Sequence, residues 1–98
     1  MLSKSQIRYL RSEAHHLHPV VLIGAQGLTE AVDKEIALAL HVHELVKIKL
    51  GNLEDDEQQA MIEHICKTHL AEFVQKIGHT AIFYKSNPEH RKYTLPKK

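Results

Sequence analysis

Residues 19–50, PVVLIGAQGLTEAVDKEIALALHVHELVKIKL, set the architecture of the chain. Residues 20–23 form a short apolar run, which is typical of a strand buried on both faces. Thr29 is placed to cap a helix over about residues 30–42, where apolar side chains recur at helical spacing. Residues 44–50 alternate apolar and polar side chains, which predicts a second strand. A strand, a helix and a strand in this order predict parallel strands joined by a right-handed crossover.

Two further helices are predicted on either side of this unit. Ser3 stands three residues before Gln6, which is the spacing of a capping box, and apolar residues then follow at helical intervals. This pattern predicts a helix over about residues 4–17. A similar spacing begins at Asp55 and predicts a third helix that ends near Leu70.

The C-terminal part of the chain predicts a β-hairpin. Residues 72–77 and 80–85 have strand character, and the two residues between them, Gly78-His79, suit a hairpin turn. Residues 86–98 form either a basic tail or a short edge strand. The resulting order, α-β-α-β-α-β-β, predicts an α/β fold in which three helices pack on a mixed four-stranded sheet. We expect residues 1–98 to form one domain.

Composition excludes several classes of protein. No apolar run approaches the roughly 18 residues that span a bilayer, and the first residues lack the apolar stretch of a signal peptide. We therefore expect a cytoplasmic protein with no membrane partner. The single cysteine, Cys66, cannot form an internal disulfide or supply a thiolate-only zinc site, and its place on an apolar helix stripe favours a core residue.

Charge is unevenly distributed along the chain. The 13 basic and 12 acidic side chains give a net charge of +1 with neutral histidines. Residues 51–75 nevertheless hold six acidic side chains and one basic one, whereas residues 76–98 hold six basic side chains and one acidic one. The near-neutral total therefore does not exclude a nucleic-acid partner, because a basic face can be balanced by an acidic one.

Basic side chains recur on two predicted elements. Arg8 and Arg11 are three residues apart, so they share the face of the first helix that its apolar stripe leaves free. Lys47 and Lys49 point to one side of the second predicted strand, and Lys85 could extend this group if the strands adjoin. The pattern suits phosphate binding, and an ordinary solvated surface is the alternative.

The glycines at positions 24 and 27 form a G-x-x-G turn between a strand and a helix N-terminus. Exposed backbone N–H groups at such a place favour a phosphate, and G-x-x-G loops clamp single-stranded nucleic acid in some folds. A plain turn is the alternative, because the same spacing arises by chance in roughly a third of chains of this length.

The sequence gives little support to the hypothesis of an enzyme or of a metal site. Nine histidines are an unusual number, and His64 and His69 lie near Cys66 on one helix, but no metal-binding spacing occurs. His15, His16 and His18 follow the first helix, where imidazoles either stabilise the helix end or contact phosphate at mildly acidic pH. No catalytic arrangement has a supporting motif, so we expect no cofactor, no bound metal and no small-molecule substrate.

An ordered set of short blocks gives the chain a family resemblance. The chain resembles the CRM domain, in its free-standing bacterial YhbY form, over about residues 2–96. The blocks are Arg11, Ala14-His15, Pro19-Val20-Val21, Ile23-Gly24, Gly27-Leu28-Thr29-Glu30, His43-Glu44-Leu45-Val46-Lys47, Ile77-Gly78 and Phe83-Tyr84-Lys85.

This resemblance implies a fold like the C-terminal domain of a translation initiation factor, RNA binding, and association with precursors of the large ribosomal subunit. By position, the RNA-binding loop falls on Gly24, Ala25, Gln26 and Gly27, and the basic surface on Arg8, Arg11, Lys47, Lys49 and Lys85. The chain departs from some relatives in two places: in the loop, Ala25 and Gln26 stand where some members carry a lysine, and His79 stands where several relatives are basic.

The leading hypothesis is a monomeric, non-catalytic RNA-binding protein that acts on large-subunit ribosomal RNA during ribosome assembly. Its affinity for RNA should rise as pH falls from about 7.5 to about 6 if the histidines contribute. The alternative is a protein-interaction module that docks on a ribosomal protein through the acidic residues 51–75 or the face of Leu45. A metal-assisted enzyme would rest on the histidine content alone.

Overall fold

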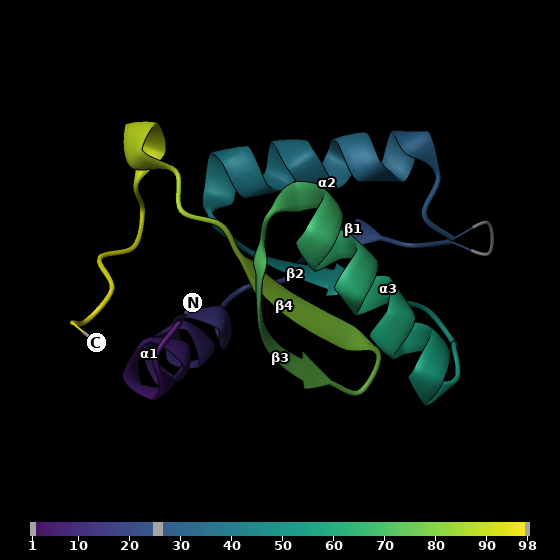
Figure 1. Ribbon diagram of the computed structural model, residues 1–98, viewed down its shortest axis with the longest axis horizontal. Coiled ribbons are helices and arrows are strands. Elements are labelled where there is room, and N and C mark those ends of the chain that lie inside the picture. Colours follow the sequence, from purple (N-terminus) through teal and green to yellow (C-terminus); the bar gives the residue numbers. More distant parts are fainter. Residues whose placement is uncertain (1, 25–26, 98) are drawn as a thin grey trace.

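The computed structural model describes residues 2–24 and 27–97 (Figure 1). The predicted order of elements is confirmed, with three α-helices and four strands in the described residues and a short 3₁₀ helix near the C-terminus. The elements are α1 Lys4–Ala14, β1 Pro19–Leu22, α2 Glu30–His43, β2 Leu45–Lys49, α3 Asp55–His69, β3 Glu72–Ile77, β4 Thr80–Tyr84 and η1 Pro88–His90.

The sheet is mixed, as predicted, and its strands run in the order β1-β2-β4-β3. β1 and β2 are parallel neighbours joined by α2, which confirms the crossover. β4 is antiparallel to both β2 and β3, and it lies between them. The second crossover, through α3, therefore places β3 parallel to β2 but one strand away, and the last strand of the chain fills the gap.

Helices cover both faces of the sheet. α2 and α3 pack on one face, where Ile36, Ile65 and Phe83 belong to a single buried cluster. α1 packs on part of the other face, where Leu10 and Tyr84 belong to a second cluster. In Figure 1 the sheet accordingly lies between α2 and α1.

The helix starts follow local capping chemistry. The Ser3–Gln6 capping box is confirmed, since the Gln6 N–H donates to the Ser3 hydroxyl at 3.2 Å and the Gln6 amide oxygen accepts from the Ser3 N–H at 3.0 Å. Thr29 caps α2 through the N–H of Val32 at 3.2 Å. The third start differs from the prediction: the residue before α3 is Glu54, and Gln58 is buried inside the fold rather than acting as a cap.

The first helix is shorter than predicted. It ends at Ala14 rather than near residue 17, because the chain tightens into a turn in which the Leu17 N–H donates to the Ala14 carbonyl at 3.0 Å. Leu17 still packs against the α1 cluster. Residues 15–17, which were predicted to be helical, instead lie in the connection between α1 and Pro19, the first residue of β1.

The first strand was predicted to be buried on both faces, and this prediction is wrong. β1 is an edge strand that pairs with β2 alone, and α1 does not extend beneath it. Val21 is buried against α2, but Leu22, on the other side, is 65% exposed, and Val20 is 48% exposed at the edge of the sheet. The face of Leu45 also differs from the docking hypothesis, because α1 buries Leu45 to 1% exposure.

A buried glutamate holds the C-terminal segment. The Glu44 carboxylate is fully buried and accepts from the N–H groups of Asn87 (2.6 Å), Lys92 (2.6 Å) and Tyr93 (3.2 Å). Gln6 adds a hydrogen bond from its side-chain amide to the carbonyl of Pro96 at 2.9 Å. The edge strand considered for residues 86–98 is absent from the described part of that segment, because Glu44 rather than a neighbouring strand accepts its N–H groups.

Candidate nucleic-acid interface

The carboxyl ends of β1 and β2 meet the hairpin turn at one edge of the sheet, which we call the loop end. The Ile23 N–H donates to the Lys49 carbonyl at 2.9 Å, and the Leu50 N–H donates to the His79 carbonyl at 2.7 Å. Gly51 lies so close that an added Cβ would stand 3.3 Å from the Ile23 carbonyl oxygen. The glycine turn is therefore anchored to β2 and to the hairpin.

Gly24 and Gly27 close a tight turn at this edge. The Gly27 N–H donates to the Gly24 carbonyl at 3.0 Å, and Gly27 has a φ of +74°, a conformation that glycine adopts without steric cost. Nothing lies within 4 Å of a Cβ added at either glycine, so both face open space. Ala25 and Gln26, the two central residues of the predicted loop, lie outside the described residues.

The N-terminus of α2 follows the turn and carries its own anions. Glu30 and Asp33 are in the first helical turn, where they complement the positive end of the helix dipole. Asp33 also pairs with His69, whose Nε2 is 3.1 Å from its Oδ1. These carboxylates oppose a phosphate at the helix end itself, so a phosphate at this edge would depend on the loop N–H groups and on nearby cations.

A row of side chains crosses the sheet beside the turn. Leu22 is paired with Lys49, Lys49 with Thr80, and Thr80 with Ile77, so all four point to the face that carries α1. α1 does not cover this end of the face, and Leu22 and Ile77 are 65% and 53% exposed. We call the uncovered part, which is made of Pro19, Leu22, Lys47, Lys49, Ile77 and Thr80, the open sheet face.

One of the two predicted arginines of α1 borders the open sheet face. Arg8 and Arg11 are exposed on α1, as their spacing predicts. With the Gln75 amide oriented so that its oxygen faces α1, it accepts from Arg11 Nε at 3.2 Å and from Nη2 at 2.9 Å. Gln75 is paired with Ile82 in the sheet, and Ile82 lines a cavity of about 180 Å³ on the open sheet face. Arg11 therefore stands at the rim of this face.

The two lysines of β2 have different surroundings. Lys49 is exposed, whereas Lys47 is half-buried and its Nζ donates to the Leu17 carbonyl at 3.0 Å. That bond ties the connection between α1 and β1 to the sheet. Lys47 thus has a structural contact, and Lys49 is the freer cation on this face.

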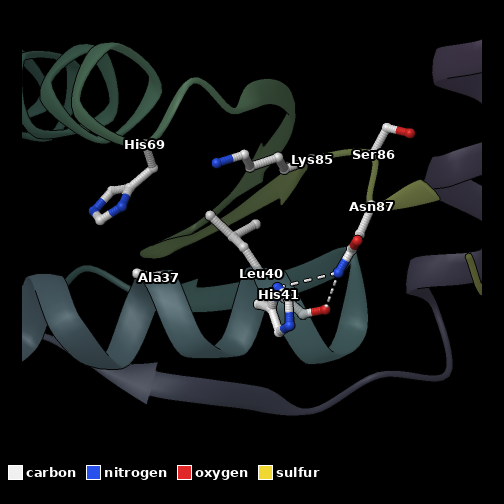
Figure 2. A pocket seen from close by; sticks show the side chains of 7 residues that line it. All are labelled: Ala37, Leu40, His41, His69, Lys85, Ser86 and Asn87. Atoms are coloured by element: carbon white, nitrogen blue, oxygen red, sulfur yellow. Dashed lines mark hydrogen bonds between the residues drawn. The ribbon is translucent and has the colours of Figure 1, made fainter. Parts of the chain in front are cut away.

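Lys85 lies at the other end of the sheet. It follows Tyr84, which pairs with Leu45, whereas Lys49 pairs with Thr80, so about five strand residues, or roughly 17 Å, separate Lys85 from the loop end. Figure 2 shows its side chain extending over Leu40 toward His69, in a cavity of about 230 Å³ between α2, α3 and the end of β4. The structure does not bring Lys85 together with the other predicted residues.

Two other side chains of the hairpin are held by α3. The Gln58 amide oxygen accepts from Lys76 Nζ at 2.7 Å, and its nitrogen is 2.8 Å from His79 Nδ1. Because lysine can only donate, the amide nitrogen must donate to the imidazole, and Nδ1 of His79 is therefore an acceptor. Lys76 also pairs with Asp55 at 3.7 Å, so it belongs to the α3 side of the sheet.

The uneven charge of the sequence becomes two differently charged sides. α3 carries Asp55, Asp56, Glu57 and Glu63, and it packs on the face opposite α1. The arginines of α1 and the lysines of β2 are thus separated from the acidic helix by the sheet. A polyanion can approach the α1 side without meeting the α3 carboxylates.

Other chemistry receives no support within the described residues. No group of three or more His, Cys, Asp or Glu in residues 2–24 and 27–97 could hold a metal ion, and no helix there is long and apolar enough to cross a membrane. Burial raises the pKa of the Cys66 thiol, and the carboxylates of Glu72 and Glu63 raise it further. A thiol in this state is a poor nucleophile, in keeping with a core cysteine.

Comparison with known proteins assigns the family. A model of the CRS1/YhbY (CRM) domain matches residues 2–85. The chain belongs to the CRM domain family. An "RNA-binding protein" of Haemophilus influenzae is 42% identical over 97 residues, covering 99% of this chain and 97% of the relative. The "Probable RNA-binding protein YqeI" of Bacillus subtilis is 39% identical over 97 residues, covering 98% of this chain and all of the relative.

A solved structure shares the fold. The solution structure of the hypothetical protein SAV1595 from Staphylococcus aureus superposes with a TM-score of 0.83 at 36% identity, covering 98% of this chain and 100% of the other. The predicted architecture, with three helices on a mixed four-stranded sheet, is therefore confirmed.

The residue that the sequence left unexplained in this CRM domain is Glu44. It lies inside the block that carries the resemblance, but its three hydrogen-bond donors lie beyond residue 85, where the family match ends. A carboxylate at the junction of a helix and a buried strand was the available signal, because a buried charge requires partners. The sequence could not show that backbone N–H groups more than 40 residues away would supply them.

Proposed function

We propose that this chain is a non-catalytic RNA-binding protein that holds RNA on the loop end, the open sheet face and the outer surface of α1. The observation that carries the proposal is the row that sets exposed Lys49 beside the glycine turn, with Arg11 at the rim of the same face. The relatives that are named as RNA-binding proteins support it. The arginines and Lys49 supply cations for phosphate.

The resemblance to YhbY-type proteins extends the proposal to a target. We infer that the RNA is large-subunit ribosomal RNA in a precursor particle, bound by a monomer in the cytoplasm during ribosome assembly. In this role the chain would need no cofactor and no small-molecule substrate. Six of the described residues predicted for the site lie on the loop end, the open sheet face or the outer surface of α1, namely Arg8, Arg11, Gly24, Gly27, Lys47 and Lys49. Lys85 lies outside the proposed interface.

A charge-matched pair of variants tests the surface. Arg11→Glu and Lys67→Glu change the net charge equally, but Lys67 is exposed on α3, across the sheet from α1. Binding of a ribosomal RNA fragment at about 100 mM salt should weaken about tenfold for Arg11→Glu, and the slope of log K against log salt should fall by about one. Equal effects from the two variants would refute the assigned surface.

The target needs a separate experiment. Ultraviolet crosslinking of the protein in cells, followed by sequencing of the attached RNA, should recover large-subunit ribosomal RNA and its precursors. Recovery of messenger or transfer RNA instead would contradict the assembly role while leaving RNA binding intact. Arg11→Glu should lower the yield of crosslinks, and Lys67→Glu should not.

A second candidate function rests on the acidic side of α3. Its carboxylates form a surface that would repel RNA and attract a basic ribosomal protein. Sedimentation with ribosomal particles distinguishes the two candidates. If Arg11→Glu no longer binds free RNA but still sediments with the particles, docking through a protein is favoured.

A further inference from the structure

Three histidines and two lysines line a cleft at the end of the sheet opposite the glycine turn. The cleft has a volume of about 360 Å³, and His16, His18, His43, Lys47 and Lys92 contribute to its lining. Its remaining lining residues are apolar side chains and Tyr93, and none of the described residues that line it is a carboxylate. The molecule therefore has a second concentration of basic groups that the proposed RNA surface does not explain.

Four parts of the chain build this cleft. His16 and His18 lie in the connection that leaves α1, His43 is the last residue of α2, Lys47 belongs to β2, and Lys92 belongs to the C-terminal segment. Two contacts fix its walls. The Lys47 Nζ donates to the Leu17 carbonyl at 3.0 Å, and the Lys92 N–H donates to the buried Glu44 carboxylate at 2.6 Å.

We propose that this cleft is a phosphate-binding site whose affinity rises as pH falls. Ammonium groups and protonated imidazoles bind phosphate oxygens through charge-assisted hydrogen bonds. Imidazoles gain that charge between about pH 7 and pH 6. The same imidazoles do not form a metal site, since no metal-binding group of three or more residues exists in the described parts of the chain.

Carboxylates on the neighbouring elements are engaged elsewhere or lie outside the lining. Glu44 is committed to three N–H groups of the C-terminal segment. Glu35 lines a neighbouring cavity that also includes His43. Burial raises the pKa of Tyr93, and Glu13 raises it further, so this phenol stays neutral in the pH range of the proposal. None of these carboxylates lines the cleft.

The phosphate could belong to RNA or to a smaller phosphorylated compound. Lys47 lines both this cleft and the cavity on the open sheet face, so a strand leaving that face would meet the histidines next. The interpretation that the bound phosphate belongs to RNA rests on the proposed function. The binding of a simple oxyanion does not depend on it, and the two can fail separately.

Sulfate is a suitable probe, because its charge does not change between pH 6.0 and 7.5. Imidazole resonances of the full chain would be followed during sulfate titrations at both pH values. An imidazole of ordinary pKa, about 6.5, is about eight times more protonated at pH 6.0 than at pH 7.5, so affinity should rise by up to about eightfold. His16→Gln/His18→Gln/His43→Gln should abolish the response. The matched controls His15→Gln and His64→Gln remove exposed imidazoles outside the cleft and should retain it.

The result that overturns the site is a sulfate response that is equal at both pH values, spread evenly over all imidazoles, or unchanged in the triple variant. If the amide spectrum shows that the triple variant is unfolded, His16→Gln/His18→Gln and Lys92→Gln, which alter only exposed residues, replace it under the same criteria.

Short RNA strands with a 5′-phosphate or a 5′-hydroxyl then identify the source of the phosphate. If the triple variant loses the pH-dependent part of its binding to both strands, the bound phosphate is an internal phosphodiester. If it loses this part only for the 5′-phosphorylated strand, the bound phosphate is the one at the 5′ end. If neither strand is affected while sulfate binding is lost, the site takes a smaller phosphorylated compound. Failure of the proposed function has a different signature: Arg11→Glu would leave RNA affinity unchanged while sulfate still bound the cleft.

Discussion

Glu44 offers the sharpest test of the packing described here. Its carboxylate is fully buried and accepts three backbone N–H groups at 2.6, 2.6 and 3.2 Å. Glu44→Ala would leave those donors without an acceptor, and each buried unsatisfied donor costs about 1–3 kcal/mol. Because solvent can enter as the segment loosens, we expect a loss of about 3–5 kcal/mol in the free energy of unfolding, which is the usual cost of breaking a buried charged network.

Two further variants separate the loss of the Glu44 carboxylate from the backbone strain at this residue. Glu44 has a φ of +62° and a ψ of −47°, a region that is costly for residues with a Cβ. Glu44→Gly also removes the carboxylate but relieves this strain, so it should be about 1 kcal/mol more stable than Glu44→Ala. Glu44→Gln keeps the shape and one acceptor, and should fall between Glu44→Ala and the parent protein.

Urea unfolding and amide hydrogen exchange provide the assay. Unfolding would be followed for the three variants and for Glu89→Gln, a matched control at an exposed glutamate of the same C-terminal segment. The amides of Asn87, Lys92 and Tyr93 should lose protection in Glu44→Ala before the sheet does. A loss below about 0.5 kcal/mol, the range of an ordinary surface substitution, would refute the reasoning.

Further predictions concern three other positions. Leu70 ends α3 in the left-handed conformation with a φ of +53° and is 79% exposed, so Leu70→Gly should stabilise the protein by about 0.5–1 kcal/mol in urea unfolding. Gly27→Ala should cost about 1 kcal/mol through strain at a φ of +74°, whereas Gly24→Ala, whose φ is not positive, should cost less; equal losses would contradict this. The Cys66 pKa is raised in the folded state, so folding favours the protonated thiol. Its contribution to stability is complete below pH 9.0, the unperturbed value, and is lost as pH rises through the folded pKa. Alkylation of Cys66 at pH 8 should accordingly be slower in the folded protein than in urea.

Local patterns were sufficient for most of the fold. The Ser3–Gln6 capping box, the Thr29 cap and the Gly78-His79 turn each depend on residues no more than three positions apart, and the structure contains all of them. The order of strands within the sheet does not follow from such local patterns. Two crossovers were predicted, but the insertion of β4 between β2 and β3 depends on pairing between segments that are more than 30 residues apart.

The outcome for β1 shows where composition misleads. An uncharged aliphatic run can be a central strand or an edge strand whose outer side is used for binding. Leu22 is exposed because α1 stops at Ala14 and covers only part of the sheet. The connection that follows α1 is tied to the sheet by a tertiary contact, the bond from Lys47 to the Leu17 carbonyl, which local periodicity does not report.

The candidate site also depends partly on local sequence patterns and partly on tertiary packing. Arg8 and Arg11 share a face because helical spacing requires it, and Lys49 stands on the opposite side of β2 from the α2–α3 core because strand alternation requires it. Whether these elements lie next to each other depends on packing. Arg11 contacts the sheet through Gln75, whereas Lys85 lies at the end of the sheet opposite the loop end. Lys49 and Lys85 are the same residue type, and only their positions in the sheet distinguish them.

The position of β4 has a consequence for how the chain is made. Synthesis delivers β4 last among the strands, yet β3 pairs with β4 alone and β2 has β4 as its second neighbour. A nascent chain that ends before Thr80 therefore holds one isolated parallel pair and a strand with no partner, which is too little sheet to be stable. The completed sheet can form only after Tyr84 has left the ribosomal exit tunnel. C-terminally truncated products should accordingly be degraded rather than accumulate as partly folded domains.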